Sequence, residues 1–229
     1  MKNFKFIHFV IATSAILFTT FLSYQFTIIN ATEIKHESTT AYKPRPGRKR
    51  TQARKPGGYR GDSCNLKSQA PVTLLVPEDH IPLTTLDHPL FFWYVNTISN
   101  PIRFTIYQPG QLSPIYVQNI TPKTPGIMAL RLPESTNALK IGVQYRWTVS
   151  VICNPEKPSE NIYAKAWIER VEDSFGIDNK SNCQSNYAKS GIWYDALSCQ
   201  AKSTEEFWSL LNQVELSTIS HNRPQITFF

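Results

Sequence analysis

The sequence predicts a mainly β fold, an antiparallel immunoglobulin-like β-sandwich of about seven strands with a C-terminal pair of α-helices. Residues 71–171 consist of short runs rich in β-branched and aromatic residues, separated by Pro, Gly and Asn, which is the usual spacing of sandwich strands. None of these runs has helical periodicity. After Phe175 such runs cease, and two apolar stripes with helical spacing follow.

Seven runs are expected to be strands: Val72–Val76, Leu90–Val95, Ile102–Gln108, Pro114–Ile120, Gly126–Leu132, Gln144–Cys153 and Asn161–Val171. The sixth run alternates, with Tyr145 and Trp147 on one face and Arg146 on the other, so one face belongs to the core. The seventh run places Trp167 between charged residues on its outer face. Turn-forming residues between these two runs predict an antiparallel hairpin.

Residues 181–201 are expected to be helical, with an apolar stripe of Ala188, Ile192, Ala196 and Cys199. A second helix is expected to begin at Ser203, because Ser203 and Glu206 form a capping box. Its stripe is Phe207, Leu210, Leu211 and Val214. We expect the pair, residues 176–216, to cover the sandwich formed by residues 61–175. For the tail at 217–229, the sequence leaves open an edge strand or disorder.

The N-terminal residues 1–31 are expected to be an export signal. Lys2 and Lys5 precede the uncharged stretch Phe9–Leu22, as in a signal peptide. Cleavage after Ala31 and an uncleaved signal anchor both remain open, because uncharged residues continue from Phe6 through Ala31 and could span a bilayer of about 30 Å. The protein is therefore expected to be periplasmic, extracellular or membrane-anchored.

The positive charge of the chain lies in a short segment. Residues 32–60 hold nine Lys and Arg against two Glu, whereas residues 61–229 hold thirteen against fifteen acids, a net −2. The folded part is therefore not basic, and no specific nucleic acid is expected. The composition of Lys43–Arg60 predicts a disordered basic linker that serves as a spacer or touches anionic envelope surfaces.

The four cysteines of this exported chain are expected to form disulfides, because no metal-ligand spacing is present. Three pairings are possible, and Cys64 with Cys153 is the preferred bond. Cys183 and Cys199 would be too far apart on one unbroken helix. Only a bend, for which Gly191 is the candidate, would bring them together.

The chain resembles an exported cyanobacterial family catalogued as domain of unknown function 928. Five segments carry the resemblance, which covers roughly residues 61–216 on the scale of a typical domain: Leu83–Val95, Thr124–Pro133, Ile141–Pro155, Ala166–Val171 and Gly191–Leu197. The resemblance implies a periplasmic or extracellular protein. It implies no activity.

Asp87 and His88 are the only pair that suggests catalysis, as a carboxylate that orients an imidazole base. Adjacent side chains in an extended segment point to opposite faces, and Pro89 favours extended geometry at His88. The pair is therefore expected to diverge, with Asp87 or Thr85 capping a turn. A nucleophile elbow is absent from the sequence as well, so an enzyme is not expected. An envelope hydrolase using Asp87 and His88 is the alternative.

The aromatic residues suggest a binding surface instead, formed by Tyr163, Trp167, Trp193 and Tyr194, with Tyr107 as a further candidate. The opposing interpretation buries Trp167 against Trp193, since large apolar side chains usually lie inside. No metal site or cofactor is expected. The sequence thus predicts a non-catalytic envelope module that binds a protein or a polysaccharide.

Overall fold

The computed structural model describes residues 41–47, 54–55, 64, 71–96, 100–174, 183–201 and 204–229. All of them belong to the unit formed by residues 39–229. The expected export signal at 1–31 lies outside the described residues, as does most of the expected linker at 32–60. Among the described helices, none combines the length and the apolarity that crossing a membrane would require.

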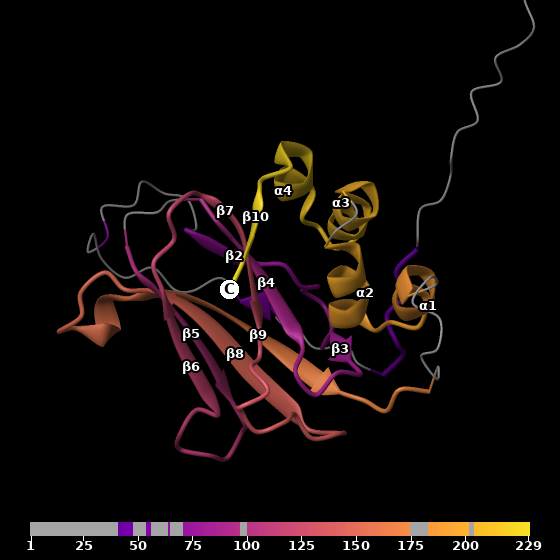
Figure 1. Cartoon of the computed structure of the whole chain (residues 1–229), viewed down its shortest axis with the longest axis horizontal. Helices are drawn as coiled ribbons and strands as arrows, with labels where there is room; N and C mark the ends of the chain where they lie inside the picture. The colour runs from indigo at the N-terminus through magenta and orange to yellow at the C-terminus, as the bar shows by residue number, and fades with distance from the viewer. Residues whose placement is uncertain are drawn as a thin grey trace, which may run out of the picture. The chain divides into compact units, whose positions relative to one another are not determined.

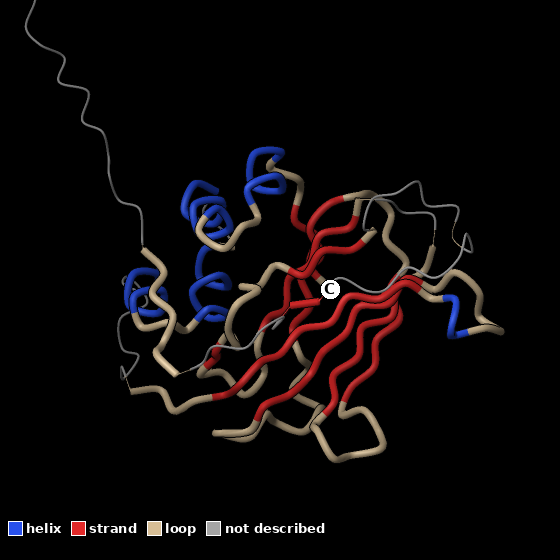
Figure 2. The backbone as a smooth tube through the Cα atoms, turned by 180° about the vertical axis from the view of Figure 1, so that it is seen from behind, coloured by secondary structure: helices blue, strands red, loops and turns tan. Residues whose placement is uncertain are grey.

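The described strands form two sheets (Figures 1 and 2). The six-stranded sheet has the order β1 (Arg54–Lys55), β9 (Ile162–Arg170), β8 (Gln144–Val151), β5 (Ile102–Tyr107) and β6 (Tyr116–Ile120), with β3 (Leu83–Thr84) also paired to β9. The four-stranded sheet has the order β10 (Ile226–Phe228), β7 (Gly126–Arg131), β4 (Leu90–Val95) and β2 (Val72–Leu74).

All seven expected strands are present, but the sheets are mixed rather than antiparallel. Strand β3 runs parallel to β9, and β10 runs parallel to β7. A parallel neighbour requires a long connection between the paired strands, and both of these pairs have one. Two-residue and three-residue strands of this kind have no sequence period of their own, which is why β1 and β3 were not expected and β10 was left open.

Strand β4 lies at the centre of the core. Phe91 and Trp93 face the other sheet, where their rings lie 5.0 and 5.9 Å from that of Phe104. Phe92 points to the opposite side, with its ring centroid 5.7 Å from that of Phe207 in the helical part. Because both faces of β4 are covered, the strand reads as a continuous apolar run instead of an alternating one.

The described residues from 183 onward form four helices rather than the expected pair: α1 (Cys183–Lys189), α2 (Trp193–Gln200), α3 (Thr204–Asn212) and α4 (Ser217–Asn222). Gly191 separates α1 from α2 with a φ of +74°, a left-handed conformation that ends a helix. The bend considered at Gly191 is therefore present. The stripe of α3 is buried as expected, because Phe207, Leu210 and Leu211 are at most 1 % exposed.

The C-terminal residues 217–229 form a helix and a strand that belong to the fold. Helix α4 ends at Arg223, which adopts a left-handed φ of +43° and turns the chain back toward the sheet. Strand β10 then pairs with β7, where Ile226 lies opposite Ile127. Of the two outcomes left open for this segment, the edge strand is the observed one (Figure 1).

Residues 41–47, which we call the N-terminal strap, contradict the expectation that the whole of 32–60 is a disordered linker. The Lys43 amide donates to the Ala188 carbonyl at 3.0 Å. The Arg45 side chain donates to the Ser190 carbonyl at 2.9 Å. Tyr42 packs against Trp193 with ring centroids 4.9 Å apart. The composition of this segment indicates disorder. It is nevertheless held in place by the apolar surface of Tyr42 and by the carbonyls at the end of α1.

The expected disulfide between Cys64 and Cys153 is present, with their Cα atoms 5.0 Å apart. It links residues separated by 89 positions and joins the segment before β2 to the end of β8. Cys199 is also disulfide-bonded. The side chain of Cys183 lies outside the described residues.

Candidate binding site

Outward-facing side chains of the six-stranded sheet, which we call the outer face, form a polar and aromatic surface. Strand β8 buries Tyr145 and Trp147 against the core, so Arg146 between them points outward. The register places Arg146 beside Tyr107 of β5 and Trp167 of β9. These three residues therefore form one row across three strands.

This row opens into a hollow where β5 ends. The hollow has a volume of about 260 Å³ and is lined by Tyr107, Gln108, Pro109, Gly110, Gln111, Arg146 and Trp167. We call it the face hollow. Its floor is the sheet, and its wall is the β5–β6 loop, whose Gly110 has a φ of +85°.

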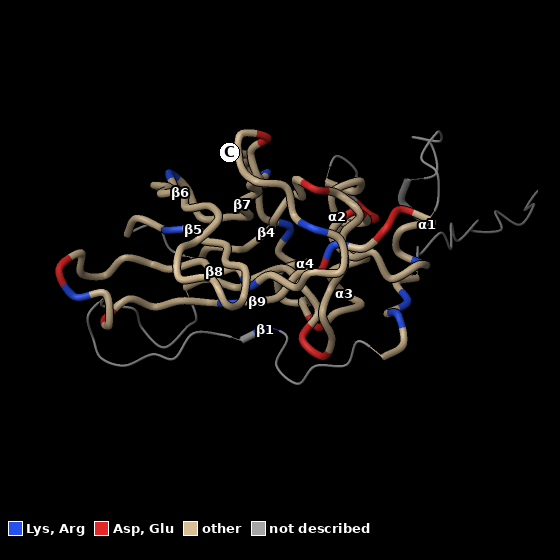
Figure 3. Tube along the Cα trace, turned by 90° about the horizontal axis from the view of Figure 1, so that it is seen from below, with Lys and Arg blue, Asp and Glu red and all other residues tan. Residues whose placement is uncertain are grey.

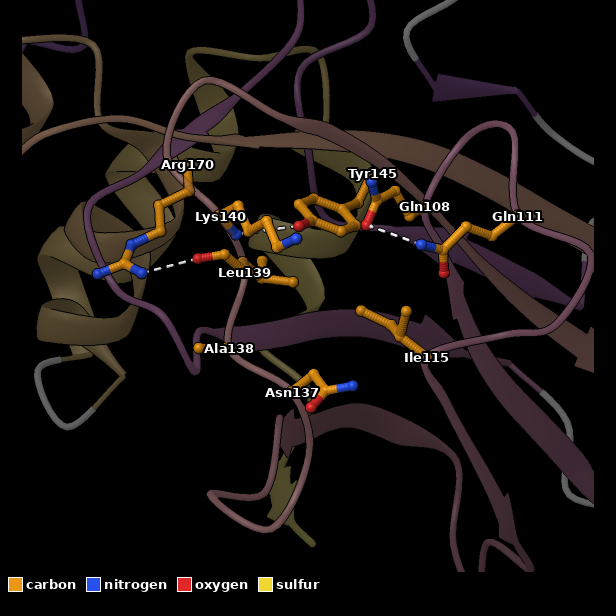
Figure 4. Close-up of a pocket in the computed structure, with 9 residues that line it drawn as sticks. All are labelled: Gln108, Gln111, Ile115, Asn137, Ala138, Leu139, Lys140, Tyr145 and Arg170. Atoms are coloured by element: carbon orange, nitrogen blue, oxygen red, sulfur yellow. Dashed lines mark hydrogen bonds between the residues drawn. The ribbon is translucent and has the colours of Figure 1, made fainter.

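A second hollow of about 510 Å³, the end hollow, adjoins the first because Gln108 and Gln111 line both. Figure 4 shows the β5–β6 loop on one side of it and residues 137–140 on the other. The full lining is Gln108, Gln111, Ile115, Asn137, Ala138, Leu139, Lys140, Tyr145 and Arg170. Together the two hollows bring amides, tyrosines, a tryptophan and three cationic side chains into one depression.

The walls of the end hollow are held by backbone groups. The Lys140 amide donates to the Tyr145 hydroxyl at 2.9 Å, which fixes the 137–140 loop to the start of β8. Arg170 donates to the Leu139 carbonyl at 2.7 Å and to the Thr85 carbonyl at 3.1 Å (Figure 4). These bonds preorganise the hollow, which lowers the cost of ordering it around a ligand.

The lining of both hollows is positively charged. Lys140, Arg146 and Arg170 contribute cations, and no Asp or Glu is among the lining residues. Figure 3 shows acidic segments at the tip of the β8–β9 loop and beside the helices instead. A site lined in this way favours a ligand with acidic groups and hydrogen-bonding oxygens.

Of the four aromatic residues expected to form a binding surface, two are buried and two lie on the outer face. Trp193 and Tyr194 are 0 and 1 % exposed, so neither belongs to a surface. The Trp193 ring nitrogen donates to the Leu75 carbonyl at 3.0 Å, and the Tyr194 hydroxyl donates to the Trp167 carbonyl at 3.0 Å. Tyr163 is 40 % exposed and Trp167 is half-buried, and both point outward from β9. The opposing interpretation is correct only for Trp193, which packs against Tyr42 rather than Trp167.

Asp87 and His88 lie together, contrary to the expected divergence. The His88 Nδ1 atom is 3.2 Å from an Asp87 carboxylate oxygen, because the chain bends at these residues instead of running extended. The other ring nitrogen, Nε2, is 3.1 Å from the Thr136 carbonyl. Partial burial raises the pKa of Asp87, but the hydrogen bond and charge of His88 and the charge of Arg170 outweigh it, so the net pKa is lowered. The pair fastens the loop after β7, and neither residue lines a hollow described above.

Asp195 of α2 is a buried carboxylate that the sequence does not reveal. It is 2 % exposed and accepts three hydrogen bonds: from the Thr84 hydroxyl at 2.5 Å, the Thr85 amide at 2.9 Å and the Thr85 hydroxyl at 2.5 Å. Burial raises the pKa of Asp195, and the bonds from the two threonines only partly offset it. The arrangement joins the first turn of α2 to β3.

A second cluster missed by sequence reasoning joins the N-terminal strap to the domain. The His80 ring lies 2.6 Å from an Asp79 carboxylate oxygen through Nδ1 and 2.7 Å from the Tyr42 hydroxyl through Nε2. Burial and the charge of Asp79 raise the pKa of Tyr42, which keeps its hydroxyl protonated. The cluster therefore suits a structural lock better than a nucleophile. Tyr42 lies 38 positions before His80, and the three residues match no spacing that points to a site.

The protein is thus a β-rich domain with a candidate ligand site. It has two mixed β-sheets, with a helical layer over one sheet and a preorganised polar depression on the other. Among the described residues, no group of His, Cys, Asp and Glu is placed to hold a metal ion. The chain belongs to the family described as Domain of Unknown Function (DUF928), whose profile matches residues 55–224. Neither curated proteins nor solved structures give a match.

Proposed function

We propose that the protein is an exported, non-catalytic binding module of the cell envelope, and that it binds polysaccharide in the face hollow and the end hollow. The observation that carries the proposal is the lining of these two adjoining hollows, in which Trp167 and Tyr107 accompany amides and cations. An aromatic ring supplies an apolar platform for a sugar ring, and amides and cations fix the orientation of its oxygen atoms.

The strand order supports a scaffold of the immunoglobulin-like kind. In that fold the first, second and fifth strands share one sheet, and the third, sixth and seventh share the other. Among the seven strands expected from the sequence, β2, β4 and β7 lie together, as do β5, β8 and β9, with β6 beside β5. The bond from the Lys140 amide to the Tyr145 hydroxyl, at the corner before β8, resembles the tyrosine corner of such domains. Domains of this kind commonly bind ligands with the loops at one end of the sandwich, and loops also form the end hollow.

Export is supported by the Cys64–Cys153 bond, because disulfides persist mainly in oxidising compartments. A hydrolase is the weaker alternative. The His88 Nδ1 atom faces Asp87 and its Nε2 atom faces the Thr136 carbonyl, and neither Asp87 nor His88 lines a hollow, so the imidazole is directed at the protein rather than at a ligand site.

Binding to a panel of soluble polysaccharides, neutral and acidic, tests the proposal. We expect Trp167→Ala to weaken binding to the preferred polymer by tenfold or more, since truncating a central aromatic residue typically costs about 2 kcal/mol. The matched control is Phe228→Ala, which removes a 55 % exposed aromatic side chain from the other sheet. Equal binding by both variants, or no binding to any polymer, would contradict the proposal. Release of reducing sugar that His88→Ala abolishes would favour the hydrolase.

A further inference from the structure

The cations on the outer face continue beyond the hollows. Arg146 of β8, Lys165 of β9 and Arg103 of β5 all point outward, in three successive rows of the sheet. The first row holds Tyr107, Arg146 and Trp167, the second Thr105, Thr148 and Lys165, and the third Arg103, Ser150 and Tyr163. Each row thus contains one cation.

Spacing along the strands makes this series a track. Outward residues recur every second position, about 6.7 Å apart at the rise of an antiparallel strand, so the first and third rows lie about 13 Å apart. Tyr163 lies in the third row, and the Lys165 ammonium is 5.9 Å from the centroid of its ring. Aromatic side chains therefore occur at both ends of the track, and hydroxyl groups of Thr148 and Ser150 lie between them.

The outer face carries almost no negative charge. Outward positions of β5, β6, β8 and β9 carry a single carboxylate, that of Glu169, which is 5 % exposed and accepts a hydrogen bond from Gln144 at 3.0 Å. The end hollow adds Lys140 and Arg170 beyond the first row. On the edge of the sheet, β1 pairs with β9 and places Arg54 opposite Ala166 and Lys55 opposite Lys165.

We propose that the outer face binds an acidic polysaccharide, whose carboxylate or sulfate groups pair with Arg146, Lys165 and Arg103 while its sugar rings pack on Trp167 and Tyr163. This inference rests on the proposed function and names its ligand class. Charge complementarity and the repeat of one cation per row favour a polymer with regularly spaced anions. Nucleic acid fits less well, because residues 61–229 carry a net charge of −2, unlike the strongly basic domains that bind it.

Affinity of the full chain for polygalacturonate and for dextran, measured at two salt concentrations, tests this inference. We expect tighter binding to polygalacturonate, with an affinity that falls as salt rises. Arg146→Ala and Lys165→Ala should each weaken that binding by about fivefold, the value of an exposed ion pair near the upper end of its usual range. Dextran binding should not respond to Lys165→Ala, because Lys165 lines neither hollow. Lys189→Ala, on the exposed side of α1, is the matched control.

The outcomes separate this inference from the proposed function. Equal affinity for dextran and polygalacturonate, or variants without effect, would overturn the acidic ligand and leave polysaccharide binding intact. Loss of binding to every polysaccharide would overturn both. Tighter binding of single-stranded DNA of similar length, through the same residues, would replace the acidic polysaccharide with nucleic acid. Arg146→Lys, which keeps the charge, should retain most of the affinity and shows that a loss in Arg146→Ala is not a folding defect.

Discussion

Replacing Asp195 tests how strongly the helical layer is joined to the sheets. Its carboxylate accepts three hydrogen bonds, from the Thr84 hydroxyl and from the hydroxyl and amide of Thr85. Hydrogen bonds to a charged group contribute about 1.5 to 3 kcal/mol each, but burying a carboxylate costs several kcal/mol. In Asp195→Ala the desolvation cost disappears, the three bonds are lost and the Thr85 amide is left without an acceptor. We therefore expect a net loss of about 3 kcal/mol.

Urea unfolding and thermal melting measure this loss. A loss of about 3 kcal/mol corresponds to a fall in Tm of about 6 to 12 °C for a domain of this size. Glu134→Ala, which removes an exposed carboxylate, is the control and should leave the Tm unchanged. A loss below about 1 kcal/mol in Asp195→Ala, within the range of an exposed polar contact, would refute the reasoning.

The same carboxylate predicts a pH dependence. Because the pKa of Asp195 is higher in the folded state than in the unfolded state, the folded protein holds this proton more tightly. Its contribution to stability is complete below the unfolded pKa and is lost as the pH rises through the folded pKa. Relative to Asp195→Asn, the wild type should therefore lose unfolding free energy as the pH rises from acidic to neutral. A difference that is independent of pH would contradict the assigned direction.

Two further predictions concern the covalent and backbone constraints. The double variant Cys64→Ser with Cys153→Ser should lose about 4 to 5 kcal/mol in urea unfolding, because the bond closes a loop across 89 positions, and a loss below 1 kcal/mol would count against it. Gly191→Ala should lower stability by about 1 to 3 kcal/mol and speed proteolysis within the N-terminal strap, since a Cβ would lie 2.7 Å from the Lys43 carbonyl oxygen. Gly110→Ala, with a φ of +85° but open space around it, is the control and should leave strap proteolysis unchanged.

The long strands and the stripe of α3 were predictable because each has a period that its own residues display. Strand β8 alternates over eight residues, and its burial follows that alternation. The short strand β3 was not predictable and β10 could only be left open, since their pairing depends on a neighbour distant in the sequence. The N-terminal strap was misjudged for a related reason. Composition reports the average tendency of a segment, whereas this one is held by specific contacts of Tyr42, Lys43 and Arg45.

The candidate site was predictable only in part. Trp167 and Tyr163 were found from the outer positions of an alternating strand, a local signal. Trp193 and Tyr194 carried no such signal, because nearly every residue in the first half of α2 is buried, and a helix enclosed on all sides shows no exposed face in its sequence. The hollows themselves depend on the β5–β6 loop and residues 137–140 meeting in space, which no local pattern records.

Asp195 explains part of the structural role of the segment Leu83–Val95. Its two threonines donate to that carboxylate, its Asp87 and His88 fasten the loop after β7, and its Phe91 and Trp93 form the contact between the sheets. Asp195 itself lies in Gly191–Leu197, another of the segments that carry the family resemblance. Two family segments, about a hundred residues apart, are thus joined by three hydrogen bonds in the interior. Their pairing gives both segments a structural role, so these two segments need not contain residues that bind a ligand. Binding specificity is then expected to reside in the outer face and the β5–β6 loop, outside these two segments.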